Sequence, residues 1–162
     1  PLQRLFDNWV WFRGESDEYT VIAAELNTSE KRGGYSIPIL YMADENNVII
    51  NRFGTNGIFT KYSNRIENVY NNKNEPLFSK LDMITVDGEK LTIEGKDIID
   101  NADMFKRTPL ASYLSWVLPI IKFGSKFSTI DPHYTRFSSD LDVSLGDTTY
   151  KGHGVLEIMD LK

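Results

Sequence analysis

Apolar and polar residues alternate with a period of two along most of this chain, which is the pattern of half-buried β-strands. The alternation begins at residues 9–13 and resumes at residues 19–26, after a turn at residues 14–17. These two segments predict a β-hairpin. The same pattern predicts further strands at residues 37–42, 48–53, 65–70, 134–145 and 154–161.

The clearest turn signal is Asp87-Gly88, which separates the alternating segments 80–86 and 90–94. Glycine tolerates the positive φ angle of a tight turn, so this sequence predicts a second hairpin. Pro38 has no backbone N–H to donate to a neighbouring strand. It therefore places its strand at a sheet edge, or lies at the start of the strand.

The regular alternation is interrupted at residues 96–130. Within this stretch, residues 109–118 predict a short helix or an irregular excursion, because Pro109 suits a first helical turn and Pro119 ends the helix. Many short strands with so little helix predict an all-β, antiparallel fold, either a barrel or a sandwich. We expect a single domain over residues 1–162, because this length suits one hydrophobic core.

The composition narrows the function classes without selecting one. The formal net charge is -5, whereas a nucleic-acid or anionic-membrane surface needs clustered Lys and Arg. The chain has no cysteine, which excludes disulfides, thiolate metal sites and a cysteine nucleophile. No apolar run reaches the roughly 20 residues that cross a bilayer. A Gly-rich phosphate loop, a nucleotide-binding fingerprint and a serine-nucleophile elbow are also absent, so we expect no cofactor.

The two histidines, His133 and His153, lie apart in the sequence without the spacing of a third metal ligand, so we expect no metal site. His153 stands between two glycines, which let another group approach the backbone closely. Its imidazole titrates near neutral pH, and His153 is therefore a candidate general acid or base. The alternative is a surface histidine at the start of a strand.

Glu157 lies inside the apolar run 155–159. An ionised carboxylate in such surroundings must face solvent or have a partner. A Glu157 that faces the barrel interior would pair with Arg13 or Arg136, or would act as a proton donor. The alternatives are an outward-facing glutamate and a structural ion pair.

Aromatic and charged residues share faces of two predicted strands. Trp9, Trp11 and Arg13 lie on one face, where two indoles and a guanidinium would stack on a flat or polyene ligand. Core packing is the alternative for the tryptophans. Tyr134 and Arg136 share the polar face of their strand, which either meets solvent or lines a polar pocket.

Glu25 is a further candidate ligand contact. It lies on the face of its strand that also carries Val21 and Ala23. The hairpin with the tryptophan strand makes Arg13 its candidate partner. The register between the two strands is not defined by the sequence.

Three short motifs at the two ends of the chain point to one family. They are Trp9-x-Trp11-Phe12, Tyr134-x-Arg136-Phe137 and Gly152-x-Gly154-x-x-Glu157-x-Met159. In these motifs the chain resembles the C-terminal half of the carotenoid 1,2-hydratase (hydroxyneurosporene synthase) and AttH-like superfamily. The resemblance implies an antiparallel lipocalin-like (calycin) barrel, as one half of a protein with two such barrels.

The resemblance also implies a function. Members include hydratases of carotenoid double bonds and pericyclase-like enzymes, so the expected ligand is a hydrophobic small molecule of isoprenoid or polyketide type. It implies that His153 and Glu157 carry acid chemistry and that Trp9, Trp11, Tyr134 and Arg136 line the cavity.

Three functions remain open: an enzyme domain, a non-catalytic ligand-binding domain, and a structural or interaction domain. Either of the first two requires an apolar internal cavity of roughly a few hundred Å³. The third would show a large apolar surface patch where a second lipocalin-like domain docks.

Overall fold

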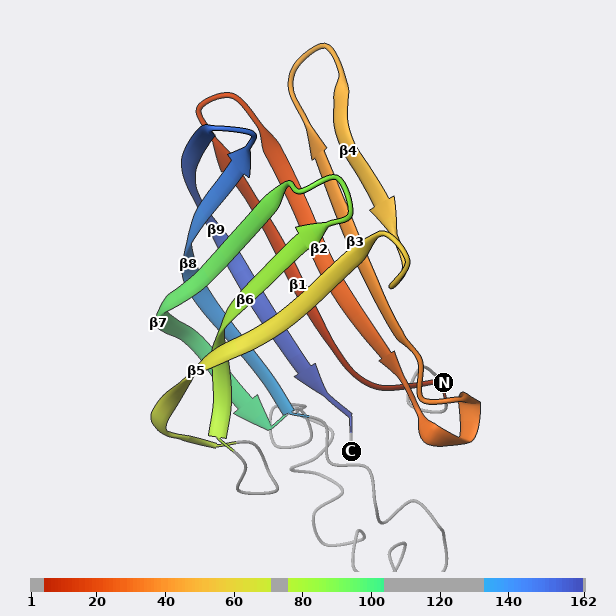
Figure 1. The fold of residues 1–162 in the computed structure, drawn as a ribbon. Helices are drawn as coiled ribbons and strands as arrows, with labels where there is room; N and C mark the ends of the chain where they lie inside the picture. The colour runs from red at the N-terminus through yellow and green to blue at the C-terminus, as the bar shows by residue number, and fades with distance from the viewer. Residues whose placement is uncertain (1–4, 71–75, 104–132, 162) are drawn as a thin grey trace, which may run out of the picture.

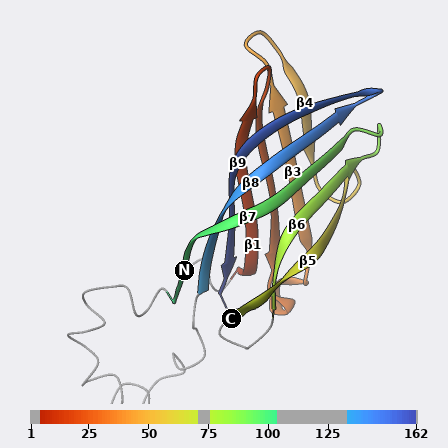
Figure 2. The ribbon, with the colours of Figure 1, turned by 90° about the vertical axis from the view of Figure 1, so that its left-hand side faces the viewer.

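The computed structural model describes residues 5–70, 76–103 and 133–161. In these residues the chain forms one antiparallel sheet of nine strands, in the order β4-β3-β2-β1-β9-β8-β7-β6-β5, which curls into a nearly closed barrel (Figures 1 and 2). The predicted all-β barrel is therefore confirmed. The elements are β1 (Phe6–Ser16), β2 (Thr20–Thr28), the 3-10 turn η2 (Glu30–Arg32), β3 (Ser36–Ala43), β4 (Val48–Phe53), β5 (Ile58–Tyr70), β6 (Pro76–Thr85), β7 (Lys90–Asp103), β8 (His133–Leu145) and β9 (Thr148–Asp160).

The hairpin predicted at Asp87-Gly88 joins β6 to β7, as expected. Gly88 has a φ of 93°, and its backbone N–H donates to the carbonyl of Thr85 at 3.1 Å. The Thr85 N–H in turn donates to the carbonyl of Glu89 at 2.9 Å. A three-residue loop with glycine in the left-handed region matches the right-handed twist of the strands that it connects.

Several strand boundaries differ from the prediction. β6 begins at Pro76 rather than at residue 80, and β7 continues to Asp103 rather than ending at residue 94. β5 begins at Ile58, although alternation indicated a strand only from residue 65, and β9 begins at Thr148 rather than at residue 154. The predicted helix at residues 109–118 lies outside the described residues. No helix in the described part of the chain is long and apolar enough to cross a membrane.

Pro38 does not lie in an edge strand, because β3 pairs with both β2 and β4. It stands one position beyond the last residue of β3 that pairs with β4, which is Ile39 opposite Phe53. The missing N–H therefore removes no bond to β4. The Pro38 carbonyl accepts a hydrogen bond at 2.8 Å from the backbone N–H of Gly54, the residue that follows β4.

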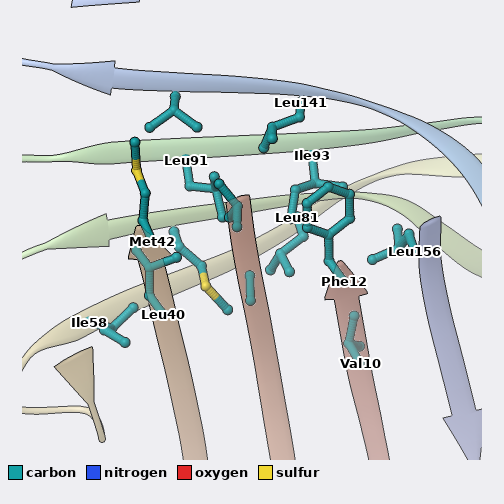
Figure 3. Packing of buried hydrophobic residues seen from close by; sticks show 14 of the residues in the cluster. Val10, Phe12, Leu40, Met42, Ile58, Leu81, Leu91, Ile93, Leu141 and Leu156 are labelled. Carbon is teal, nitrogen blue, oxygen red and sulfur yellow. The ribbon is translucent and has the colours of Figure 1, made fainter. Parts of the chain in front are cut away.

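Alternate side chains of the strands meet inside the barrel and form one apolar core (Figure 3). Phe12 on β1 and Phe137 on β8 are its largest members, and both are fully buried. The remaining fully buried side chains are smaller: Val21, Leu40, Met42, Ile58, Leu81, Met83, Leu91, Ile93, Leu141 and Leu156.

Small residues make room for the two phenylalanine rings. Register places Gly14, Gly154, Ser139 and Gly95 side by side across β1, β9, β8 and β7. A Cβ atom at Gly154 would lie 2.6 Å from the Phe12 ring, and one at Gly95 would lie 3.0 Å from the Phe137 ring. The rings therefore occupy the space that side chains along this row would otherwise fill.

This packing predicts the effect of a methyl group at Gly154. The substitution Gly154→Ala would push against the Phe12 ring and the backbone of Gly14, so we expect the free energy of unfolding to fall by about 1–3 kcal/mol. Chemical denaturation measures it. Gly57→Ala is the matched control, because the nearest atom to its added Cβ lies 3.8 Å away. An equal loss at both positions would contradict the packing argument.

Candidate functional site

The interior of the barrel changes from apolar to polar toward the end at which β7 finishes and β8 begins (Figure 1). Phe12 packs level with Ala23 and Leu156. One step toward this end, Val10 lies level with Glu25, and one step further Asn8 lies level with Asn27. The polar side chains inside the barrel therefore gather at one end, which is the candidate site.

Glu25 on β2 is the centre of this polar end. Its side chain faces inward, and the residue is only 4% exposed. One carboxylate oxygen, Oε1, accepts hydrogen bonds from the hydroxyl of Ser36 and, at 2.6 Å, from the hydroxyl of Thr60. The other oxygen, Oε2, accepts a hydrogen bond from the Tyr62 hydroxyl. We call these four residues the Glu25 cluster.

The Glu25 cluster lies at the place where backbone pairing stops. β4 and β5 are the two ends of the sheet order, so no ladder of backbone hydrogen bonds joins them in the described structure. Ser36 belongs to β3, whereas Thr60 and Tyr62 belong to β5. The carboxylate of Glu25 therefore connects the two sides of the barrel seam through side-chain hydrogen bonds.

Hydroxyl donors make a buried carboxylate tolerable at this position. An ionised carboxylate without partners in the interior costs several kcal/mol. Arg13, the partner expected from the sequence, lies opposite Ile22 and points out of the barrel, so it does not reach Glu25. Charge-assisted hydrogen bonds from three hydroxyls take its place.

The phenol of Tyr62 is held in its neutral form. Burial, together with the nearby negative charge of Glu25, raises the pKa of Tyr62 well above its ordinary value of 10.0. A neutral phenol keeps its proton for the hydrogen bond to the carboxylate. The pair is thus a buried carboxylate with a proton-bearing partner.

A second polar group completes this end of the barrel on the opposite wall. A ring nitrogen of His133, Nε2, contacts the side-chain oxygen of Asn101, and the Thr135 hydroxyl donates to the same oxygen at 3.2 Å. His133 is buried, whereas Asn101 is exposed. The polar group on this wall thus runs from the buried ring of His133 to the exposed side chain of Asn101.

Trp9, Trp11 and Arg13 do not line the interior, contrary to the expectation. The buried residues of β1 are Val10 and Phe12, and the alternate residues point outward. Trp11 is 37% exposed and lies opposite Ala24 on β2. The sequence pattern was ambiguous here because β1 is apolar on both of its faces.

Arg136 and Glu157 form an ion pair, but on the outer face. Register places them directly opposite each other on β8 and β9. Arg136 donates from Nε and Nη2 to one oxygen of Glu157, at 3.1 and 2.8 Å, and its guanidinium lies 5.9 Å from the centre of the Tyr134 ring. Burial and the neighbouring Glu157 raise the pKa of Tyr134. The side chains of the pair are 35% and 20% exposed, so solvent screens it and its contribution to stability is small.

His153 also faces outward, two residues along β9 from Val155 on the same face as Glu157. It stands between Glu15 on β1 and Asp140 on β8 and is exposed. The structure agrees with the alternatives given for both residues: His153 is a surface histidine, and Glu157 faces outward in an ion pair with Arg136. On β9 the inward positions belong to Leu156 and Ile158 and to the glycines.

The structure does bring most of the sequence candidates together, on the outside of the barrel. Trp9 lies beside Met159, which lies beside Tyr134. Trp11 lies beside Glu157, which pairs with Arg136. These residues belong to what we call the outer apolar face, whose apolar members are Trp9, Trp11, Ile22, Ala24, Leu26, Ile37, Ile39, Tyr41, Phe53, Tyr134, Val155 and Met159.

Two hollows lined by described residues lie on the outer surface. One, of about 440 Å³, is lined mainly by charged side chains of β7, β8 and β9, such as Glu94, Lys96 and Asp142. The other, of about 220 Å³, lies between the β1–β2 and β3–β4 turns and is lined by acidic residues such as Glu15 and Asp44. Neither is the apolar internal cavity expected from the sequence. The described residues contain no group of three or more His, Cys, Asp or Glu side chains that could hold a metal ion.

Sequence reasoning missed Ser36, Thr60 and Tyr62. A signal for the last two was present, because Ile58, Thr60 and Tyr62 alternate with Phe59 and Lys61. That alternation would have placed the two hydroxyls on the inner face of a strand. Their meeting with Glu25 depends on the barrel closing, which no local pattern encodes.

Comparison with known proteins identifies the fold. No protein-family model and no curated protein matches the chain. Among solved structures, CghA matches with a TM-score of 0.63 over 100% of this chain at 8% identity, and CghA with Sch210972 matches with a TM-score of 0.62 over 99%. Kievitone hydratase from Nectria haematococca matches with a TM-score of 0.56 over 96% at 9% identity. The fold is a lipocalin-like barrel. The chain spans 42% of the length of CghA and 40% of that of kievitone hydratase, and at such low identity the likeness shows the fold alone.

The raised pKa of Tyr62 predicts a loss of stability in alkali. The unfolded chain releases the phenol proton near pH 10.0, before the folded chain does. The contribution of Tyr62 to the free energy of unfolding is therefore complete below pH 10.0 and is lost as the pH rises above it. In Tyr62→Phe we expect the free energy of unfolding to fall less in alkali than it does in the wild type. At neutral pH we expect it to be lower than that of the wild type by about 1–2 kcal/mol, because a hydrogen bond is lost. Urea titrations across the pH range measure both. Tyr35→Phe, at a residue that is 66% exposed, should match the wild type.

Proposed function

We propose that this chain is a lipocalin-like domain that binds a hydrophobic small molecule of isoprenoid or polyketide type, with the polar group of that molecule at the Glu25 cluster. The observation that carries the proposal is the position of Glu25. Among the described residues it is the only carboxylate that is buried, and it faces the inside of the barrel. A ligand pocket typically combines apolar walls with a few polar groups that fix orientation.

The interior of the barrel is apolar at one end and polar at the other, which supports this position for the ligand. The end near the β6–β7 and β8–β9 turns is filled by side chains such as Met83, Leu91 and Leu141. The opposite end carries the Glu25 cluster on one wall, and on the other wall His133 and Thr135. Neither hollow of the described residues lies inside the barrel, so the internal cavity expected from the sequence does not support this proposal. The polar groups alone place the polar part of the ligand at this end and not in the packed core.

The chemistry that the Glu25 cluster offers is proton transfer, and it favours a hydratase- or cyclase-type enzyme. Alkene hydration adds a proton to one carbon and the hydroxyl of water to the other. In this proposal the Glu25 carboxylate takes a proton from the attacking water, the Tyr62 hydroxyl donates its proton to the other carbon, and Glu25 then returns a proton to Tyr62. Thr60 and Tyr62 hold the carboxyl group in place. The likeness in fold to kievitone hydratase is consistent with this reaction class.

A second lipocalin-like domain is part of the proposal. The chain covers less than half the length of each of the two solved proteins that it resembles, so those proteins carry further structure of comparable size. The outer apolar face is the surface that such a domain would cover. Trp9, Trp11, Tyr134 and Arg136 would then lie at the contact between domains, and they remain candidate ligand contacts there.

Native mass spectrometry of the purified chain tests ligand binding. We expect a retained small molecule in the wild type, and a loss of at least about tenfold in occupancy in Glu25→Gln, because the amide cannot accept all three hydroxyl hydrogen bonds. Asp140→Asn is the matched control, since it removes an exposed carboxylate on the charged outer wall at β8. Thr60→Val, which leaves the carboxylate intact, provides a second variant where Glu25→Gln fails to fold. Equal occupancy in Glu25→Gln and the wild type would refute the assignment.

Turnover separates the enzyme from the non-catalytic binding domain. With an isoprenoid alkene as the substrate, an enzyme domain would lose hydration in Glu25→Gln by about 10²-fold or more, as expected for removal of a general base. Substitutions at His153 and Glu157 should leave the rate unchanged. Ligand retention by a wild-type chain without turnover would favour the binding domain.

A further inference from the structure

The negative charge of Glu25 has no positive partner in the described part of the chain. The residue is 4% exposed, and its carboxylate accepts hydrogen bonds from three neutral hydroxyls. The buried residues of the described ranges include neither lysine nor arginine. Buried charges in proteins are usually paired with an opposite charge. The polar end of the barrel is therefore unusual, because it holds an anion that only neutral groups stabilise.

The arginines of the neighbouring strands are directed elsewhere. Arg13 and Arg136 point out of the barrel, and Arg136 already forms an ion pair on the outer face. Arg52 on β4 forms an ion pair with Asp87, which lies in the β6–β7 turn at the opposite end of the barrel. These three cationic side chains therefore do not neutralise the Glu25 cluster.

The other polar groups at this end of the barrel supply no excess of positive charge. The basic side chain on the opposite wall is His133, which contacts Asn101. Register sets Asp160 on β9 directly beside His133 and also beside Asn8 on β1. A carboxylate thus accompanies the imidazole. Asn8 itself accepts a hydrogen bond at 2.8 Å from the side-chain amide of Asn27, and this pair is uncharged.

One acceptor position of Glu25 is left for a ligand. An ionised carboxylate has about four lone-pair sites on its two oxygens. Ser36 and Thr60 donate to Oε1, whereas Tyr62 alone donates to Oε2. A group that fills the remaining site on Oε2 must carry a hydrogen-bond donor. A hydroxyl has one, and an ionised carboxylate has none.

A ligand carboxylate at this position would also meet a like charge. Two carboxylates that share a site cannot both stay ionised, so one of them has to take up a proton. At and above neutral pH that uptake is unfavourable, because a carboxylic acid in solution has lost its proton there. A ligand hydroxyl avoids this penalty and adds a hydrogen bond to Oε2.

We propose that the polar end of the barrel selects its ligand by charge: it binds a hydrophobic molecule that ends in an uncharged hydroxyl and excludes the corresponding carboxylate. The inference deepens the proposed function and rests on it, because it names the polar group that meets the Glu25 cluster. Hydration of an alkene yields an alcohol, so the hydroxyl of the product takes the place on Oε2 that the attacking water held. The same selection applies to a non-catalytic binding domain.

Isothermal titration calorimetry with farnesol and farnesoic acid tests the selection. The two probes share one isoprenoid chain and differ in the polar group, which is a hydroxyl in farnesol and a carboxyl in farnesoic acid. At about pH 8, where a free carboxylic acid is ionised, the wild type should bind farnesol at least about tenfold more tightly than farnesoic acid. This comparison needs no variant, so it does not depend on whether a substituted chain folds.

Two substitutions test whether Glu25 causes the preference. Glu25→Gln removes the charge, so the dissociation constants of the two probes should approach each other even where both probes bind more weakly. Asn27→Lys places an ammonium group on the same face of β2 as Glu25, and it should improve the binding of farnesoic acid relative to farnesol. Asp140→Asn is the matched control, because it removes an exposed carboxylate on the outer wall and should leave the preference unchanged.

Three results would overturn the selection. Equal affinity for the two probes in the wild type would refute it and leave the ligand site in place. A preference that both Glu25→Gln and Asn27→Lys leave unchanged would show that the charge of Glu25 is not its cause. Tighter binding of farnesoic acid that Arg13→Gln abolishes would place the ligand on the outer apolar face instead.

Failure of the proposed function gives a different result. If neither probe binds and native mass spectrometry finds no retained molecule, ligand binding is refuted and the selection with it. If neither probe binds but a molecule is retained, its polar group decides: an alcohol supports the selection, and a carboxylic acid overturns the selection alone.

Discussion

The barrel depends on one buried carboxylate. Backbone hydrogen bonds join eight neighbouring pairs of strands but leave the seam between β4 and β5 open in the described structure. At this seam Glu25 gathers the hydroxyls of Ser36, Thr60 and Tyr62. A neutral residue of the same shape would accept fewer hydrogen bonds, and an apolar one would leave three hydroxyls without their acceptor. The same interaction therefore closes the barrel and gives its interior a reactive group.

The sequence was sufficient for the fold but not for the direction of the side chains. Alternation and the Asp87-Gly88 turn were enough to predict an all-β antiparallel fold, and the resemblance in the terminal motifs favoured a barrel over a sandwich. In β1 and β9, however, apolar residues occupy both faces, so the period of two does not say which face points inward. Glu157 shows the consequence: in sequence it looks buried, while in the structure it is an outward partner of Arg136.

Most of the predicted site residues do lie close together, but on the outer surface of the barrel and not inside it. Trp11, Tyr134, Arg136 and Glu157 lie close together, because β1, β9 and β8 are neighbours in the sheet. Their location on the outer surface depends on the register of those strands, which long-range pairing determines. The polar interior was not predictable, since Glu25 meets residues that follow it by 11, 35 and 37 positions.

The row of small residues beneath the phenylalanine rings has a consequence for how this sequence can vary. Phe12 and Gly154 share a single volume, and so do Phe137 and Gly95. The two pairs differ in what else crowds the glycine: a Cβ at Gly154 would also meet the backbone of Arg13 and Gly14, whereas the nearest atoms to one at Gly95 all belong to the Phe137 side chain. Within any set of homologues glycine should therefore persist at position 154, while positions 95 and 137 should covary although 42 residues separate them.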